Sequence, residues 1–120
     1  MGKRILIVDD EKDIAMLIHH WLEQRQFEIE EAHSGSEALK RIFRGGIDLV
    51  LMDYEMKDIK GDRLCLMIRE DNNMRKLPVI IVTGHMEIDD QVFKEYGANE
   101  VVYKPVNADE LVEKIEHCLK

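Results

Sequence analysis

Five short strand-like runs alternate with helical patterns along the chain. The runs cover residues 3–8, 27–32, 48–52, 78–82 and 100–104. The first, third and fourth are apolar almost throughout, which is typical of parallel strands covered on both faces, whereas the second alternates like an edge strand. The clearest helical series repeats at i, i+3, i+4, i+7 and i+8, and is predicted to form one apolar stripe: Ile14, Leu17, Ile18, Trp21 and Leu22. The pattern predicts an α/β fold of the (βα)5 type, an open parallel sheet with helices on both faces and right-handed crossovers.

Helix-start signals agree with this segmentation. Ser34 stands three residues before Glu37, at capping-box spacing. Asn107 and Glu110 repeat that spacing before the last helical series. No linker or low-complexity segment interrupts the pattern, so we expect a single domain over residues 1–120.

Composition and charge narrow the classes of protein. A net charge of -8 argues against nucleic-acid binding and against docking on anionic membranes, because both need Lys and Arg side chains. The apolar runs are too short to span a bilayer, and the N-terminus carries no cleavable apolar segment, so we expect a cytoplasmic protein. Cys65 and Cys118 lie in helical patterns without metal-ligand spacing and are expected to be reduced.

Polar residues follow four of the five predicted strands. In an open α/β sheet, ligands bind beyond the carboxyl ends of the strands. The residues delivered there are Asp9, Asp10, Asp53, Thr83 and Lys104. Taken singly, each has a structural explanation as a helix cap, a turn residue, a strand-end threonine or a solvated lysine.

The set is harder to explain structurally. Two carboxylates about 5 Å apart repel by roughly 3 kcal/mol at an effective dielectric near 20, so three together need a cation. Lys104 offsets one charge, and the remaining deficit suits Mg²⁺, which binds few carboxylates and keeps several waters. One acid could then accept a phosphoryl group as an aspartyl phosphate.

At these residues the chain resembles a known family, the CheY-like receiver domain of two-component response regulators, over essentially its whole length. The matching motifs are "VDDE", "DLVLMDYEM" with Gly61 eight residues beyond Asp53, "VTG" and "KP". The resemblance implies a flavodoxin-like, doubly wound sheet of five parallel strands in the order 2-1-3-4-5. It also implies a signalling switch that turns over no metabolite and catalyses only its own phosphorylation and dephosphorylation.

The resemblance assigns a phosphoacceptor and metal ligands. Asp53 is implied to be the phosphoacceptor. Asp10 and Asp53 are implied to bind Mg²⁺ directly, Asp9 through a water, and Glu55 through its backbone carbonyl.

Two further side chains and one peptide bond receive roles in the same way. Thr83 is implied to be the switch hydroxyl and Lys104 the cationic partner of the phosphoryl group. The peptide bond between Lys104 and Pro105 is implied to be cis.

The resemblance also implies partners. A sensor histidine kinase or a histidine phosphotransfer protein would donate the phosphoryl group. An effector or output domain would read the face made by the fourth helix, the fifth strand and the fifth helix. Homodimerisation stays open at this level.

The sequence departs from the family pattern at two places. Val101 stands three residues before the lysine, where the family usually has Tyr or Phe, and Tyr103 is interpreted chiefly as a surface tyrosine. Met56-Lys57 replaces the usual Met-Pro, which predicts a looser loop.

Some acidic and histidine residues carry separate hypotheses. Glu55 is predicted to pair with Lys104 in the absence of phosphate, with a solvated glutamate as the equal alternative. His85 is interpreted as a surface histidine that could instead gate water or sense pH. His19 and His20 are adjacent and cannot share a helical face, so we assign them no metal.

Three alternatives compete with the switch. An aspartyl-nucleophile phosphatase of the haloacid-dehalogenase type would carry an Asp-x-Asp pair and a cap domain, which are not found here. A flavodoxin-type carrier needs a phosphate loop, and "DDEKD" would repel phosphate. A degenerate receiver could act only as a protein-binding module. The retention of all five site residues counts against this alternative.

Overall fold

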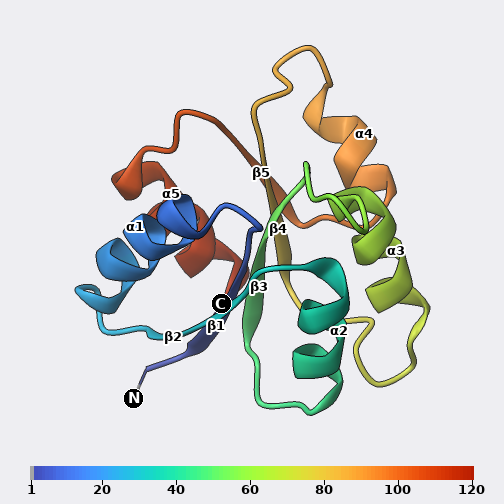
Figure 1. Cartoon of the computed structure of the whole chain (residues 1–120), viewed down its shortest axis with the longest axis horizontal. Helices are drawn as coiled ribbons and strands as arrows, with labels where there is room; N and C mark the ends of the chain where they lie inside the picture. The colour runs from blue at the N-terminus through green and yellow to red at the C-terminus, as the bar shows by residue number, and fades with distance from the viewer. Residues whose placement is uncertain (1) are drawn as a thin grey trace.

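The computed structural model describes residues 2–120, which form five strands and five helices in strict alternation (Figure 1). The strands are β1 (Arg4–Val8), β2 (Glu28–Ala32), β3 (Leu49–Asp53), β4 (Val79–Thr83) and β5 (Glu100–Tyr103). The helices are α1 (Lys12–Glu23), α2 (Gly35–Phe43), α3 (Gly61–Glu70), α4 (Asp90–Glu95) and α5 (Ala108–Cys118). All strands are parallel, in the order β2-β1-β3-β4-β5. The predicted fold class and strand order are confirmed.

The sheet separates two apolar cores. Helices α2, α3 and α4 cover one face, and α1 with α5 covers the other (Figure 1). Side chains of β1 alternate between them, with Leu6 and Val8 in the first core and Ile5 and Ile7 in the second. Every residue of β3 and β4 is buried, whereas β2 pairs on one side only and stays mostly half-exposed. The central strands therefore carry their terminal side chains into a desolvated region.

The apolar stripe of α1 matches the predicted one at Ile14, Ile18, Trp21 and Leu22, which pack in the second core, and differs from it at two positions. The helix buries Ala15, Ile18 and Leu22, whereas the side chain of Leu17 is 49% exposed. The small Ala15 lies on the face nearest the sheet, and a count of large apolar residues overlooks it. Leu17 instead lines a shallow apolar cavity with Val106 on the molecular surface.

Side-chain caps fix the starts of two helices. The Ser34 hydroxyl accepts the Glu37 N–H at 3.1 Å, and the Asn107 side chain accepts the Glu110 N–H at 2.9 Å. The Glu37 carboxylate bonds the His33 N–H rather than that of Ser34, so the box at α2 is only half formed. Both predicted helix starts are confirmed.

The sequence predicted reduced cysteines and no membrane-spanning segment. Cys65 and Cys118 are both free, the first buried and the second half-buried. Among residues 2–120, no helix combines the length and the apolar character needed to cross a bilayer.

Candidate functional site

Residues from four strands meet at the carboxyl edge of the sheet. Asp9 follows β1, Asp53 ends β3 and Thr83 ends β4, and their exposed fractions are only 3%, 3% and 0%. Lys104 follows β5, and its backbone N–H donates to the Thr83 carbonyl at 2.8 Å. The parallel register is what gathers these residues, because each leaves the sheet at the same edge.

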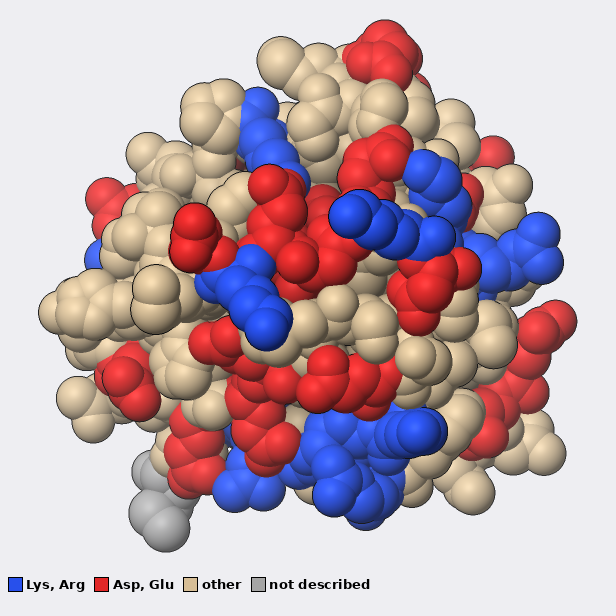
Figure 2. Space-filling view, in the orientation of Figure 1, with Lys and Arg blue, Asp and Glu red and all other residues tan. Residues whose placement is uncertain are grey.

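Three carboxylates form one cluster there. Oxygens of Asp9, Asp10 and Asp53 all lie within 4.8 Å of one another. Burial raises the pKa of Asp9 to about 6, opposed in part by the hydrogen bond it accepts from the Glu11 N–H. Figure 2 shows acidic side chains gathered near the centre of this face, with Lys and Arg side chains at their border. The cluster is an electrostatically unfavourable arrangement in a protein without a bound cation.

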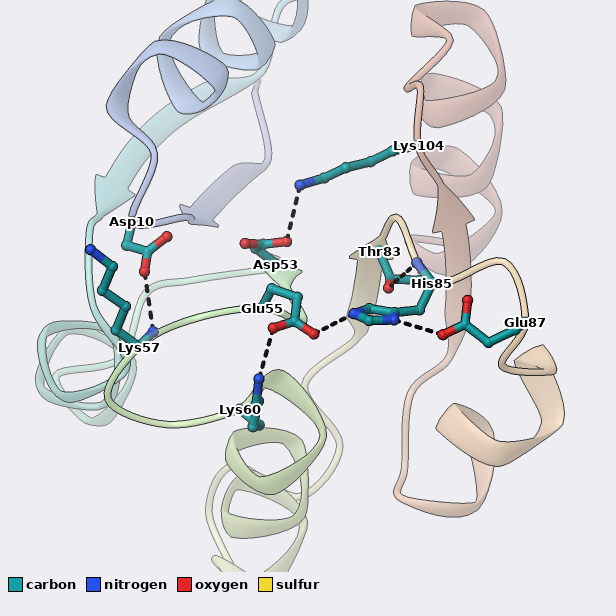
Figure 3. Close-up of polar contacts among 9 residues, drawn as sticks. All are labelled: Asp10, Asp53, Glu55, Lys57, Lys60, Thr83, His85, Glu87 and Lys104. Carbon is teal, nitrogen blue, oxygen red and sulfur yellow. Dashed lines mark hydrogen bonds and ion pairs between the residues drawn. The ribbon is translucent and has the colours of Figure 1, made fainter.

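Asp53 is the least satisfied member of the cluster. Its Oδ1 is buried and accepts no hydrogen bond from any of the described residues. Lys104 Nζ lies 3.3 Å from that oxygen, an ion pair without hydrogen-bond geometry (Figure 3). Burial raises the pKa of Asp53, and the nearby ammonium of Lys104 partly counters this. A buried carboxylate oxygen with an open coordination position fits a hard divalent cation or an incoming electrophile.

Asp10 and the loop after β3 hold each other. The Asp10 side chain, which is half-buried, accepts the Lys57 N–H at 3.1 Å. Proline in place of Lys57 could not make this bond, because it has no N–H. Met56 is 3% exposed and packs in the core. The departure from Met-Pro thus supplies a hydrogen bond that proline could not make, which counts against the predicted loosening of this loop.

Gly61 allows the loop after β3 to return close to the backbone of Asp53. A Cβ atom there would lie 2.8 Å from the Asp53 carbonyl oxygen and 2.9 Å from the Tyr54 Cα. The Gly61 N–H also donates to the Tyr54 carbonyl at 3.0 Å. The start of α3 thus packs directly on the backbone that carries Asp53.

Thr83 and the peptide bond after Lys104 shape the other side of the cluster. The Thr83 hydroxyl oxygen accepts the His85 N–H at 3.0 Å, which leaves its own proton free to be donated. The Lys104–Pro105 peptide bond is cis.

Glu55 does not pair with Lys104, so that hypothesis is wrong. Its carboxylate bonds Lys60 Nζ at 2.7 Å and His85 Nε2 (Figure 3). Lys104 reaches the buried Asp53 instead, whereas Glu55 lies on the exposed rim where Lys60 and His85 are its neighbours. Bonds to Lys60 first and then to His85 lower the pKa of Glu55. His85 therefore belongs to the rim of the site, where its other ring nitrogen bonds Glu87.

Tyr103 is not the surface tyrosine that the sequence predicted, and its neighbour Val101 on β5 is buried. Val101 is 2% exposed and belongs to the core. Tyr103 is half-buried, and its hydroxyl donates to the Ile88 carbonyl at 2.7 Å, across the loop that follows β4.

One residue of the site region went unnoticed in the sequence. The Asp58 carboxylate accepts the N–H groups of Gly35 at 2.9 Å and Ser36 at 3.0 Å, and so caps α2 from a distant loop. These bonds hold the pKa of Asp58 below its usual range. No local pattern signals this contact, because it joins segments more than twenty residues apart.

Fold and site together define a class of protein. Its members are α/β proteins with a parallel five-stranded sheet that carries three acids and a lysine at its carboxyl edge. The model of the response regulator receiver domain family matches residues 5–116. The chain is 30% identical over 118 residues to the response regulator ArlR of Staphylococcus saprophyticus, covering 98% of this chain and 52% of ArlR. It is 35% identical over 115 residues to the CAI-1 autoinducer sensor kinase/phosphatase CqsS of Vibrio cholerae, covering 94% of this chain and 17% of CqsS.

A solved structure agrees closely. The response regulator TrrA of Thermotoga maritima, crystallised in complex with Mg²⁺-BeF, superimposes with a TM-score of 0.88 and 38% identity, covering 98% of this chain and 99% of TrrA. The chain belongs to the receiver domain family of two-component response regulators. It spans about half the length of ArlR and less than a fifth of CqsS.

Proposed function

We propose that this receiver domain is a phosphoryl-accepting switch with Asp53 as the acceptor. The observation that carries the proposal is the buried Asp53 Oδ1, which accepts no hydrogen bond from the described residues and faces Lys104 Nζ at 3.3 Å. A carboxylate with an unused lone pair beside a cation suits nucleophilic attack on phosphorus. The new bond joins an Asp53 oxygen to phosphorus, and the bond from phosphorus to the donor's imidazole nitrogen breaks.

The acid cluster fits a Mg²⁺ site. Asp10 and Asp53 would be direct ligands, Asp9 a ligand through water, and the Glu55 carbonyl a further ligand. The open position on Asp53 and the mutual repulsion of the three acids support this assignment, as does the Mg²⁺-BeF complex of TrrA. When bound, the ion would neutralise the cluster and the charge of a phosphoryl group.

Lys104 and Thr83 would hold the phosphoryl group once it is attached. The Lys104 ammonium already lies against the acceptor oxygen and would pair with a phosphoryl oxygen. The Thr83 hydroxyl can donate its free proton to another oxygen of the group. Each bond would move a side chain at the end of a strand, which is how a local charge could bias the loops after β4 and β5.

Partners follow from this chemistry. The donor would be a sensor histidine kinase or a histidine phosphotransfer protein. The reader would be an effector or output domain on the face formed by α4, β5 and α5, with a homodimer as a further use of that face. We propose a cytoplasmic domain that binds neither nucleic acid nor membrane itself, and whose only reactions are its own phosphorylation and dephosphorylation.

Intact mass spectrometry tests the acceptor. The protein is incubated with acetyl phosphate or phosphoramidate and Mg²⁺, and one phosphoryl adduct is expected. EDTA and Asp53→Asn should each remove the adduct, whereas Glu55→Gln, a matched change of an acid two residues away, should keep it. An adduct that persists in Asp53→Asn refutes the acceptor, and sustained turnover of p-nitrophenyl phosphate would establish a phosphatase instead.

A further inference from the structure

Hydrogen bonds tie the loop between β3 and α3 to the segments beside it. The loop covers residues 54–60 and carries Glu55, whose backbone carbonyl is a proposed Mg²⁺ ligand. The Lys57 N–H donates to the Asp10 carboxylate at 3.1 Å (Figure 3), and the carboxylate of the next residue, Asp58, binds the start of α2. One bond therefore joins the loop to the acid cluster, and its neighbour joins the loop to a helix.

Asp58 uses both of its carboxylate oxygens in these contacts. Its Oδ1 accepts the Gly35 N–H at 2.9 Å and the N–H of Ile59 in its own loop at 2.9 Å. Its Oδ2 accepts the Ser36 N–H at 3.0 Å. Gly35 and Ser36 are the first two residues of α2, whose N–H groups find no partner within the helix. The side chain thus fixes the direction of its own loop against α2.

Helix α2 has a cap of its own. The hydroxyl of Ser34, its N-cap residue, accepts the Glu37 N–H at 3.1 Å, and Ala38 and Ile42 pack in the first core. The far end of the loop lacks such a cap, because Lys60, the N-cap residue of α3, makes no cap bond with its side chain. The helix is therefore the fixed partner in the contact with Asp58, and the loop is the part that is held.

A close packing contact reinforces the bond. A Cβ atom on Gly35 would lie 2.9 Å from the Cβ and 3.1 Å from the Cδ1 of Ile59. Ile59 also packs against the first core. Loop and helix therefore meet directly beside the Asp58 contact, and no side chain fits between them at position 35.

We propose that Asp58 is a positioning residue of the Mg²⁺ site. By tying the loop to α2, it holds the Lys57 N–H against Asp10 and fixes the backbone that carries the Glu55 carbonyl. Mg²⁺ demands near-octahedral coordination, so ligands that are placed beforehand raise its affinity. The inference rests on the proposed Mg²⁺ site and adds to it a residue that touches neither the ion nor a phosphoryl group.

The physical basis is the freedom that the loop would have without this tie. A free loop would have to be ordered when the cation binds, and the lost conformational freedom lowers affinity. Asp58 is exposed, so replacing it opens no cavity in the core. Substitution at this position therefore frees the loop without removing core packing.

Titration of the isotope-labelled full chain with Mg²⁺, followed by NMR, tests the role of Asp58. Asp58→Ala should weaken Mg²⁺ binding by about tenfold. Asp58→Asn keeps one oxygen as an acceptor, so its affinity should fall between those of Asp58→Ala and the wild type. Asp62→Asn is the charge-matched control, because it removes one acid from the first turn of α3 and should leave the affinity nearly unchanged.

Gly35→Ala approaches the same contact from the helix without changing any charge. Alanine is a better helix former than glycine, so a purely structural role predicts a more stable protein with unchanged affinity. We expect weaker Mg²⁺ binding instead, because the new Cβ would push Ile59 and its loop away from α2. Ser36→Ala is the matched control, since Ser36 is exposed and keeps the N–H that Asp58 binds.

Amide hydrogen exchange of Lys57 in EDTA supplies a readout that needs neither metal nor phosphoryl transfer. Exchange should be faster in Asp58→Ala and Gly35→Ala than in the wild type, because the Lys57 N–H is then held less often against Asp10. The proposal fails if Asp58→Ala keeps either the wild-type affinity or the wild-type exchange rate, or if Asp62→Asn weakens binding as much as Asp58→Ala.

The same titrations separate this inference from the proposed function. Equal Mg²⁺ affinity in the wild type and in all variants overturns only the role of Asp58. Absence of Mg²⁺ binding by the wild-type chain overturns the proposed metal site itself.

Discussion

Asp53 and Glu55 are carboxylates two residues apart in the chain, yet they are in opposite electrostatic situations. Asp53 is buried, has one oxygen without a hydrogen bond, and burial raises its pKa. Glu55 is exposed, bonds Lys60 and His85, and has its pKa lowered by them. Figure 3 shows both acids at one edge of the sheet, with Lys104 facing only the first.

The difference follows from position on the backbone. Asp53 is the last residue of a strand whose every side chain is buried, so the fold determines where its carboxylate lies. Glu55 belongs to a loop, where its side chain can turn toward whichever cation is near. Asp53, whose position is fixed by the sheet, therefore has fewer hydrogen-bond partners than Glu55, and this leaves one of its oxygens available for chemistry. The number of contacts that an acid makes is a poor guide to its functional role.

The largest expected effect is the pH dependence of stability that comes from Asp9, which is buried like Asp53. Its pKa in the folded protein is raised to about 6, above the value near 3.8 of an exposed aspartate. Protonated Asp9 therefore stabilises the folded protein by up to about 3 kcal/mol. This contribution is fully present below about pH 4 and is lost as pH rises through 6. Urea unfolding between pH 4 and 7.5 in EDTA measures it. Asp9→Asn should flatten the dependence, and parallel curves for the two proteins would contradict this account.

Removing the lysine that faces Asp53 should have the next largest effect. Lys104→Met removes the ammonium that pairs with Asp53 in the three-acid cluster, and we expect the free energy of unfolding in EDTA to fall by about 2 kcal/mol at pH 7.5. Added Mg²⁺ should restore most of it. The control is Lys60→Met, which removes the partner of the exposed Glu55 and should leave the urea midpoint unchanged. Equal losses in the two variants would remove the distinction between the two acids.

Neutralising Asp53, the proposed acceptor, should stabilise the metal-free protein. Asp53→Asn relieves repulsion from two acids and loses one attraction to Lys104, so we expect a gain of about 1 kcal/mol in EDTA. Differential scanning calorimetry with and without Mg²⁺ measures the gain, and the metal-dependent rise in Tm should disappear. Glu55→Gln should show no such gain, and a destabilised Asp53→Asn would argue against a strained acid cluster.

The smallest effect should come from the rim. Glu55→Gln removes a negative charge from the neighbourhood of a phosphoryl group, so we expect the phosphorylated form to last about twofold longer. Release of inorganic phosphate from the purified phosphoprotein measures its lifetime, and Glu87→Gln is the matched control because it contacts only the far nitrogen of His85. A shorter lifetime in Glu55→Gln would reverse the expected sign.

Much of the fold was predictable because its signals are local. The continuous apolar runs of β3 and β4 and the caps at Ser34 and Asn107 each depend on residues close in sequence. The place of Ala15 in the stripe of α1 was missed because its small side chain carries little hydrophobic signal but permits close approach to the sheet. Strand order came from the family resemblance, since periodicity alone does not distinguish between arrangements of parallel strands.

The site was predictable to the extent that strand ends determine it. Asp9, Asp53, Thr83 and Lys104 meet because parallel strands end at one edge. Partners on loops were not predictable in the same way, and Glu55 was assigned the wrong lysine. Choosing between Lys60 and Lys104 requires knowing which of them a competing buried acid already holds, and that is a property of the assembled site.

The contact at Gly61 limits how this protein can diverge in sequence. Any side chain at that position would enter the space of the Asp53 carbonyl oxygen, so even the smallest substitution displaces the backbone of Asp53, the proposed acceptor. Lys60 and Asp62, on either side, project outward and meet no such barrier. In a library that varies all three positions, selection for phosphorylation should recover only glycine at position 61 and many different residues at positions 60 and 62.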